Sequence, residues 1–238
     1  MTVQAALESA LSEVAASPVR VHCAGRTDTG VHASGQIIHF DAPVARNSKA
    51  WVLGTNTHLP RDVRVLWAVA VPEDFHARFS ALSRRYRYII SNTRIAPALL
   101  HGQVTWQRAP LDAPLMHAEA QALLGERDFS SFRAASCQSL TAMRNVHSIE
   151  VSRRGDLVVI DIQANAFLHH MVRNIAGGLM QVGSGREGEG WIAKLMALKD
   201  RTQGADTAAP HGLYLVEVAY PVEYGFPKAL TGPPLLAN

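Results

Sequence analysis

Two strand-like runs joined by a short turn constrain the fold of this chain more than any other feature of its sequence. Val146–Val151 and Leu157–Ile162 are rich in β-branched residues, and Arg153–Asp156, which contains Gly155, lies between them. A connection this short joins antiparallel neighbours, so the segment is predicted to form a β-hairpin. The apolar period then changes to that of a helix over residues 170–182. Strands and helices grouped in this way favour an α+β fold.

A second pair of strand-like runs lies near the start of the chain. Val19–Cys23 and Gln36–Phe40 flank a polar loop, Ala24–His32. Two hairpins, each adjoining helices, predict a mostly antiparallel central sheet of two lobes with helices packed on one side. The other predicted elements are helices at 3–14, 50–53, 116–124 and 191–199 and strands at 63–71, 83–90 and 213–220.

The length of 238 residues suits one large domain or two small ones. We expect an N-terminal lobe over residues 1–92, which carries the Ala24–His32 loop, and a C-terminal lobe over residues 93–224. Residues 225–238 are rich in proline and are predicted to form an extended or disordered tail.

Composition excludes several classes of protein. The chain is 47% hydrophobic and 18% charged, and it has no run of eighteen apolar residues that would span a bilayer. Glu8 and Glu13 interrupt any signal-peptide pattern, and Cys23 and Cys137 do not form a CxxC motif. We therefore expect a cytoplasmic protein without membrane contact. The net charge of +3 is a weak indication of nucleic-acid binding, since many other enzymes share it.

The Ala24–His32 loop carries more chemical groups than a turn requires. Arg26 and Asp28 lie between Gly25 and Gly30, and glycine permits backbone conformations that are closed to other residues. One interpretation is structural: Asp28 and the neighbouring threonines hydrogen-bond the amides of their own loop. The other is that Asp28 is a reactive carboxylate, presented on a loop as many functional side chains are.

The loop resembles the signature G-R-T-D-x-G-V-H of the tRNA pseudouridine synthases called the TruA family, whose aspartate is catalytic. The resemblance continues through five further blocks, which keep the family's order and cover most of the chain. These blocks are Asp74–Ala81, Arg84–Tyr88, Asp128–Arg133, Asn165–Asn174 and Gly212–Leu215. One block could arise by chance, but the same five in order could hardly do so.

The resemblance implies an enzyme of the pseudouridine synthase fold that isomerises uridine to pseudouridine at positions 38, 39 and 40, in the anticodon arm of tRNA. It also implies that Asp28 is the catalytic residue and that the protein acts as a homodimer on one tRNA. The reaction moves the glycosidic bond from N1 to C5 without oxidation, reduction or hydrolysis, so no cofactor and no metal are expected. A carboxylate beside the sugar suits it, and attack and elimination both stay open as the first step.

Three further residues match family positions that support the aspartate. Arg173 is the expected ion-pair partner of Asp28. Tyr86 is implied to stack near the target base and to take a proton from the sugar, and Leu213 is implied to pack against the base from the other side. Without the resemblance Tyr86 needs no function, because strand alternation places Tyr86 and Tyr88 on one face, as core residues would be.

Several basic residues are expected to bind RNA. Arg84 and Arg85 are candidates for contact with the RNA backbone, and Arg26 is expected to orient the loop and the RNA. His169 and His170 are candidates for binding phosphate, with pairing to the sheet backbone or simple packing as alternatives. A metal site is not expected at these two histidines, since neighbours on a helix point about 100° apart and no acidic or cysteine partner recurs at ligand spacing.

One departure from the family and two rival functions remain. Family members usually carry a strand and a loop before the first helix, and here that strand is missing unless the start lies upstream of Met1. A shortened tRNA-binding homologue with impaired catalysis is therefore the alternative. A glycoside hydrolase ranks far below, because it needs a second carboxylate, and neither Asp41 nor Asp62 lies in a supporting motif.

Overall fold

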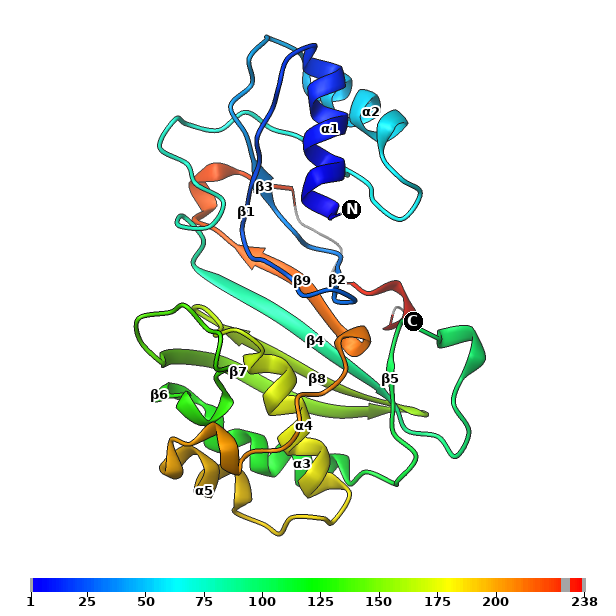
Figure 1. The fold of residues 1–238 in the computed structure, drawn as a ribbon, viewed down its shortest axis with the longest axis vertical. Helices are drawn as coiled ribbons and strands as arrows, with labels where there is room; N and C mark the ends of the chain where they lie inside the picture. The colour runs from blue at the N-terminus through cyan, green and yellow to red at the C-terminus, as the bar shows by residue number, and fades with distance from the viewer. Residues whose placement is uncertain (1, 228–231, 237–238) are drawn as a thin grey trace. The chain divides into compact units, whose positions relative to one another are not determined.

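The computed structural model describes residues 2–227 and 232–236, and the chain divides into two compact units that interleave along the sequence (Figure 1). The first comprises Met1–Arg26, Gln36–Ala81 and Tyr220–Ala229, and the second Thr27–Gly35, Leu82–Ala219 and Leu230–Asn238. The ranges expected from the sequence, 1–92, 93–224 and 225–238, are contiguous instead. The difference arises because strand pairing joins distant segments: Thr27–Gly35 hydrogen-bonds to the sheet of the second unit.

The first unit contains two helices and a short strand pair. α1 (Val3–Ala15) begins at Thr2, whose Oγ1 accepts a hydrogen bond from the N–H of Ala5 (3.1 Å). Such a cap stabilises a helix by about 1 kcal/mol. α2 (Ser48–His58) packs against α1. The helix predicted at 3–14 is confirmed, and the one predicted at 50–53 is longer than predicted.

β1 (His22–Cys23) and β3 (Ile38–His39) pair antiparallel in this unit, as predicted, although both strands are shorter than their apolar runs. The strand predicted at 63–71 is wrong, because those residues form no ladder. The side chain of Asn56 bonds both backbone groups of Val65 instead, through Oδ1 and Nδ2 at 2.8 Å each. At Val65, an amide side chain thus makes the two hydrogen bonds that the backbone of a neighbouring strand would otherwise make.

The second unit is built on a seven-stranded mixed sheet. Its order is β2 (His32–Ala33), β9 (Leu213–Ala219), β4 (Ser83–Ser91), β8 (Leu157–Ala164), β7 (Met143–Arg154) and β6 (Gly125–Asp128), with β5 (Thr105–Trp106) on β4. β2 runs parallel to β9, and β5 parallel to β4; the other pairs are antiparallel. The predicted hairpin is confirmed as β7 and β8, with Gly155 at φ +57° in its turn.

Helices cover one face of this sheet. α3 (Ala113–Ala120), α4 (Met171–Gly183) and α5 (Trp191–Leu198) pack on that face with a buried core that includes Tyr88, Ile160 and Ile162 (Figure 1). The alternate residues Ile89, Val159 and Val216 form a second core on the opposite face. Short 3₁₀ turns lie at Ala98–Leu100, Gln121–Leu123, Ser130–Phe132, Arg201–Gln203, Pro210–Gly212, Val222–Tyr224 and Pro234–Leu236. The α+β fold class and the one-sided helices are confirmed.

Part of the predicted tail is packed against the second unit. Leu236 is 8% exposed in the core on the face away from the helices, and its carbonyl accepts a hydrogen bond from Arg154 Nη1 (3.2 Å). Residues 228–231 and 237–238 of that tail lie outside the described part of the chain. Among the described residues, no helix combines the length and the apolar character needed to cross a membrane.

Candidate active site

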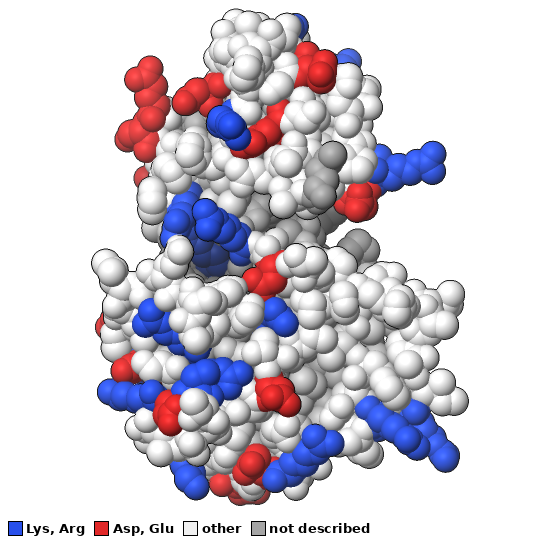
Figure 2. All heavy atoms as spheres, in the orientation of Figure 1, with Lys and Arg blue, Asp and Glu red and all other residues white. Residues whose placement is uncertain are grey.

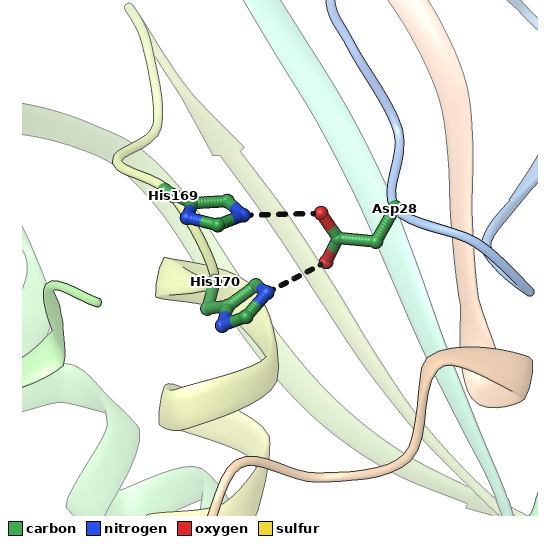
Figure 3. Close-up of side chains that lie close together, drawn as sticks. All are labelled: Asp28, His169 and His170. Atoms are coloured by element: carbon green, nitrogen blue, oxygen red, sulfur yellow. Dashed lines mark ion pairs between the residues drawn. The ribbon is translucent and has the colours of Figure 1, made fainter. Parts of the chain in front are cut away.

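The carboxylate of Asp28 meets three basic side chains from one other segment of the second unit. Arg173 Nη1 donates to Oδ2 at 2.7 Å. His169 Nε2 lies 3.3 Å from Oδ1 and His170 Nε2 lies 3.2 Å from Oδ2 (Figure 3). The Asp28 side chain stays 28% exposed. The structural interpretation of the loop is therefore insufficient, because the carboxylate contacts basic side chains that are remote in sequence while remaining open to solvent.

Strand pairing and glycine geometry hold the Asp28 loop against the sheet. The N–H groups of Ser34 and Gly35 both donate to the carbonyl of Leu215, at 3.0 and 3.1 Å. A Cβ on Gly35 would lie 2.2 Å from the Val216 carbonyl oxygen, so a side chain there would push the strands apart. Gly30, at φ +84°, makes the turn that follows Asp28. The loop is thus fixed on β9 immediately after the carboxylate.

Arg173 lies in the first turn of α4 and is anchored at both ends of its guanidinium. Nε donates to the carbonyl of Ala208 (2.8 Å), while Nη1 holds Asp28. The N–H of Ala208 in turn donates to the Arg173 carbonyl (3.3 Å). Because the side chain is only 13% exposed, its charge is poorly screened and its orientation toward Asp28 is restricted. The structure brings this expected pair together.

His169 and His170 are not successive residues of a helix. α4 begins at Met171, and His170 precedes it in the left-handed region, at φ +61°. This backbone reversal lets both rings face Asp28 with their centroids 3.9 Å apart (Figure 3). The helical spacing argued from the sequence therefore does not apply here. Burial lowers the pKa of His170; the Asp28 carboxylate opposes that shift, and the nearby positive charges add to it.

Tyr86 and Leu213 lie in the core that the helices cover. Their exposed fractions are 9% and 7%. They occupy the antiparallel neighbours β4 and β9, where Tyr86 is opposite Leu215 and Leu213 is opposite Tyr88. The Tyr86 ring meets the edge of Phe167 at a centroid distance of 5.1 Å. Their roles toward a base stay predictions.

The arginines predicted to bind RNA differ in their contacts within the protein and in the unit to which they belong. Arg85 makes a two-pronged ion pair with Asp161, at 2.6 and 2.9 Å, and this hydrogen bonding raises its pKa. Arg84 Nη1 donates to the carbonyl of Asn165 (3.2 Å). Arg26 is an exposed residue of the first unit. Figure 2 shows Lys and Arg interspersed with Asp and Glu on the face in view, so charge alone does not mark an RNA surface there.

Sequence reasoning missed two residues that stabilise the segment carrying Ala208. Asn174 is 3% exposed; its Nδ2 donates to the Phe132 carbonyl (2.8 Å), and its Oδ1 accepts from Thr207 Oγ1 (2.7 Å). The Tyr88 hydroxyl donates to the Ala209 carbonyl (2.8 Å), and burial raises the pKa of Tyr88 to about 12. The available signal for Asn174 was an amide immediately before the apolar run Ile175–Met180 of a helix.

Comparisons with known proteins agree with the motifs in this site. A family model described as tRNA pseudouridine synthase matches residues 1–80 and 120–221. The tRNA pseudouridine synthase A of Shewanella amazonensis is 57% identical over 232 residues, which cover 98% of this chain and 89% of the relative. The proteins of the same name from Legionella pneumophila strain Corby and Escherichia coli O1:K1 are each 58% identical, over 98% and 100% of this chain and 88% of each relative. The chain therefore belongs to the tRNA pseudouridine synthase family.

Proposed function

We propose that this protein isomerises uridine to pseudouridine at positions 38, 39 and 40 in the anticodon arm of tRNA, with Asp28 as the nucleophile. The observation that carries the proposal is the solvent-accessible Asp28 carboxylate held 2.7 Å from the Arg173 guanidinium. Relatives named tRNA pseudouridine synthase A, at 57–58% identity, support the substrate class. No observation favours the alternative of a catalytically impaired tRNA-binding protein.

The chemistry needs an anion close to the sugar of the target uridine. In one route Asp28 bonds to C1′ as the bond to N1 breaks, and the base then turns and attacks C1′ through C5, which breaks the bond to Asp28 and restores the carboxylate. The proton on C5 leaves to solvent, and N1 gains one, so atoms and charge balance without any redox step. Elimination to a glycal would instead remove the C2′ proton of the sugar as the bond to N1 breaks, and that proton returns to C2′ when C5 bonds to C1′. Either route requires the nucleotide to leave the base stack first.

The remaining pocket residues are proposed to receive the turned-out uridine. Tyr86 is proposed to stack near the base and take a proton from the sugar, and Leu213 to pack against the base's other face. Their support is their position on neighbouring strands, with both side chains in the core that α4 helps to form. Both side chains are shielded from water, as suits groups that would contact a base at the reacting centre.

The direct test is release of tritium from tRNA transcripts labelled at C5 of uridine. Conversion at positions 38, 39 and 40 frees the label, whereas binding alone frees none. Transcripts in which those uridines are replaced by cytidine serve as the matched control. Release from the substituted transcripts at the same rate would contradict the proposed positions, and no release from any transcript would contradict the enzymatic function.

Arg26, Arg84, Arg85, His169 and His170 are proposed to contact the RNA backbone. We expect Arg84→Ala and Arg85→Ala each to weaken tRNA binding and to reduce the slope of log K against log salt by roughly 0.7–0.9 for each phosphate that the variant no longer binds. Arg20→Ala is the control, because Arg20 is an exposed residue of the first unit that pairs with Glu8. An unchanged salt slope for Arg85→Ala would show that Arg85 contacts no phosphate and serves its ion pair with Asp161 instead.

Asn174→Ala is expected to lower stability and kcat together. It leaves the Phe132 carbonyl without this donor and the Thr207 hydroxyl without its acceptor, although Arg201 Nη2 still donates to Thr207 Oγ1; a buried group left unpaired costs about 1–3 kcal/mol. The displaced segment includes Ala208, whose carbonyl orients Arg173. Urea unfolding and tritium release measure the two effects. Thr202→Ala, an exposed residue nearby whose side chain bonds Asp200, is the control, and equal losses in both variants would contradict the role of Asn174.

We further propose that the protein is a cytoplasmic homodimer that holds one tRNA across both subunits. The support is the shared family of its relatives. Light scattering of the tRNA complex measures the subunit number directly, and a complex of one chain with one tRNA would contradict this arrangement.

A further inference from the structure

The cluster around Asp28 also has the composition of a metal site. Asp28, His169 and His170 each offer one ligand atom, and these atoms all lie within 4.8 Å of one another (Figure 3). Two imidazoles and a carboxylate are donors that suit zinc-class transition metals, whereas magnesium and calcium prefer oxygen. Two ligands come from adjacent residues and the third from a loop remote in sequence, so tertiary structure alone assembles the set.

We propose that Asp28, His169 and His170 bind a divalent transition metal ion of the zinc class, and that the bound ion blocks the isomerisation. Zinc bonds to nitrogen and oxygen ligands are about 2.0–2.2 Å long, so neighbouring ligands of a tetrahedral ion lie roughly 3.3 Å apart. The carboxylate oxygens of Asp28 lie 3.3 Å from His169 Nε2 and 3.2 Å from His170 Nε2. Each histidine nitrogen thus already lies at a ligand-to-ligand distance from one carboxylate oxygen, His169 from Oδ1 and His170 from Oδ2.

The surroundings of His169 suit a metal ligand. A metal-bound histidine coordinates through one ring nitrogen and donates its other N–H to an acceptor, which fixes the ring. His169 Nδ1 lies 3.0 Å from Ser136 Oγ, which can accept that hydrogen bond while Nε2 faces Asp28. The backbone of His169 is also held, since its carbonyl accepts from the N–H of Ala134 at 3.1 Å. The ring is thus oriented before any ion arrives.

Access and charge set the expected strength of the site. The side chains of Asp28, His169 and His170 are 28%, 40% and 28% exposed, so an ion can reach them from solvent. Arg173 competes for Oδ2, the oxygen that His170 faces, and its positive charge repels a cation. We therefore expect binding weaker than at a four-ligand structural zinc site.

Inhibition is expected because the metal ion and the reacting substrate would use the same carboxylate, that of Asp28. An ion that coordinates Asp28 withdraws the electron pair that the proposed reaction directs at C1′, so metal and reacting substrate exclude each other. This half of the inference rests on the proposed role of Asp28, whereas metal binding itself does not. Magnesium, which is added to keep tRNA folded, is expected not to occupy the site because of its preference for oxygen ligands.

Cobalt titration of tag-free, chelator-stripped protein tests the binding. Co²⁺ in a four- or five-coordinate site of this kind absorbs visible light, and Zn²⁺ should displace it. We expect one such site in the wild type, with affinity reduced by at least about tenfold in His169→Gln and in His170→Asn, since even outer-shell losses cost 10–100-fold. Asn tolerates the left-handed backbone at position 170. Unchanged affinity in both variants would overturn the site.

A second histidine cluster provides the matched control. His22, His39 and His76 pack together in the first unit, with ring centroids 4.5–5.4 Å apart. The double variant His22→Gln, His76→Gln should keep the cobalt signal. Loss of the signal in that variant would show that cobalt binds at the second cluster and not at Asp28.

In the wild type, Zn²⁺ should also protect His169 and His170, but not exposed His147, from diethylpyrocarbonate. Equal modification with and without Zn²⁺ would contradict the proposal without relying on any variant.

Tritium release with and without Zn²⁺ tests the inhibition. Loss of activity that EDTA restores, in the wild type and in the His22→Gln, His76→Gln control alike, is the expected result, with no loss caused by Mg²⁺. Full activity at a Zn²⁺ concentration that saturates the cobalt-detected site would overturn the inhibitory half. The proposed function is tested separately, because the activity of Asp28→Ala is measured without any added transition metal.

Discussion

Asp28→Ala is expected to lower the rate of tritium release from labelled tRNA by at least about 10⁴-fold, as loss of a catalytic nucleophile does in other enzymes. The variant removes the carboxylate that lies 2.7 Å from Arg173 and faces both histidines. Binding of tRNA should remain, because affinity for nucleic acid comes mostly from phosphate contacts. Single-turnover kinetics and filter binding measure the two quantities on the same preparation.

Two further variants make this result interpretable. Asp28→Asn keeps the shape of the side chain and an oxygen for Arg173, so an equal loss of activity would assign the effect to the negative charge. Asp41→Ala, on an exposed residue of the first unit, should keep wild-type activity. Activity of Asp28→Ala within tenfold of wild type would contradict the proposed chemistry. Losses of activity and tRNA affinity by the same factor would instead indicate a folding defect.

Arg173→Lys is expected to reduce kcat by about 10²–10³-fold, the range seen when one preorganised donor is removed from an active site. The guanidinium donates through Nε to Ala208 and through Nη1 to Asp28 at the same time. A lysine keeps the charge but has one nitrogen, so it cannot reproduce both directions. The Asp28 carboxylate would then lose its fixed orientation toward the sugar.

Separate measurement of kcat and KM distinguishes this role from RNA binding. A loss confined to kcat is expected, whereas a rise in KM with kcat unchanged would reassign Arg173 to a phosphate contact. Arg186→Lys is the matched control, because Arg186 is exposed in the loop that follows α4. Thermal unfolding of both variants shows whether the loss of activity exceeds any loss of stability.

Local patterns were sufficient to predict the elements that later carry the site. The hairpin of β7 and β8, the first helix and the helical period that became α4 were all predicted without tertiary information. Each depends on interactions within a few residues along the chain, such as a turn glycine or a capping hydroxyl. Asp28 itself was identified from its motif, which lies within one loop.

Other features depended on which distant segments meet. The run 63–71 alternates like a strand, but the Asn56 side chain satisfies Val65 and no strand forms. The left-handed backbone at His170 overturned the helical spacing assumed for His169 and His170. The side-chain contact at Val65 and the dihedral angle at His170 are each local features, and a sequence pattern spread over several residues does not predict them.

The sequence by itself determined the chain's family, its α+β class and the chemical groups available at Asp28, Arg173 and the two histidines. Only the tertiary structure decided that these groups meet on one carboxylate, that Arg85 pairs with Asp161, and that Asn174 and Tyr88 hold the segment carrying Ala208. The physical reason is range: propensity and motif act along the backbone, whereas ion pairs and buried hydrogen bonds act between atoms that folding brings together.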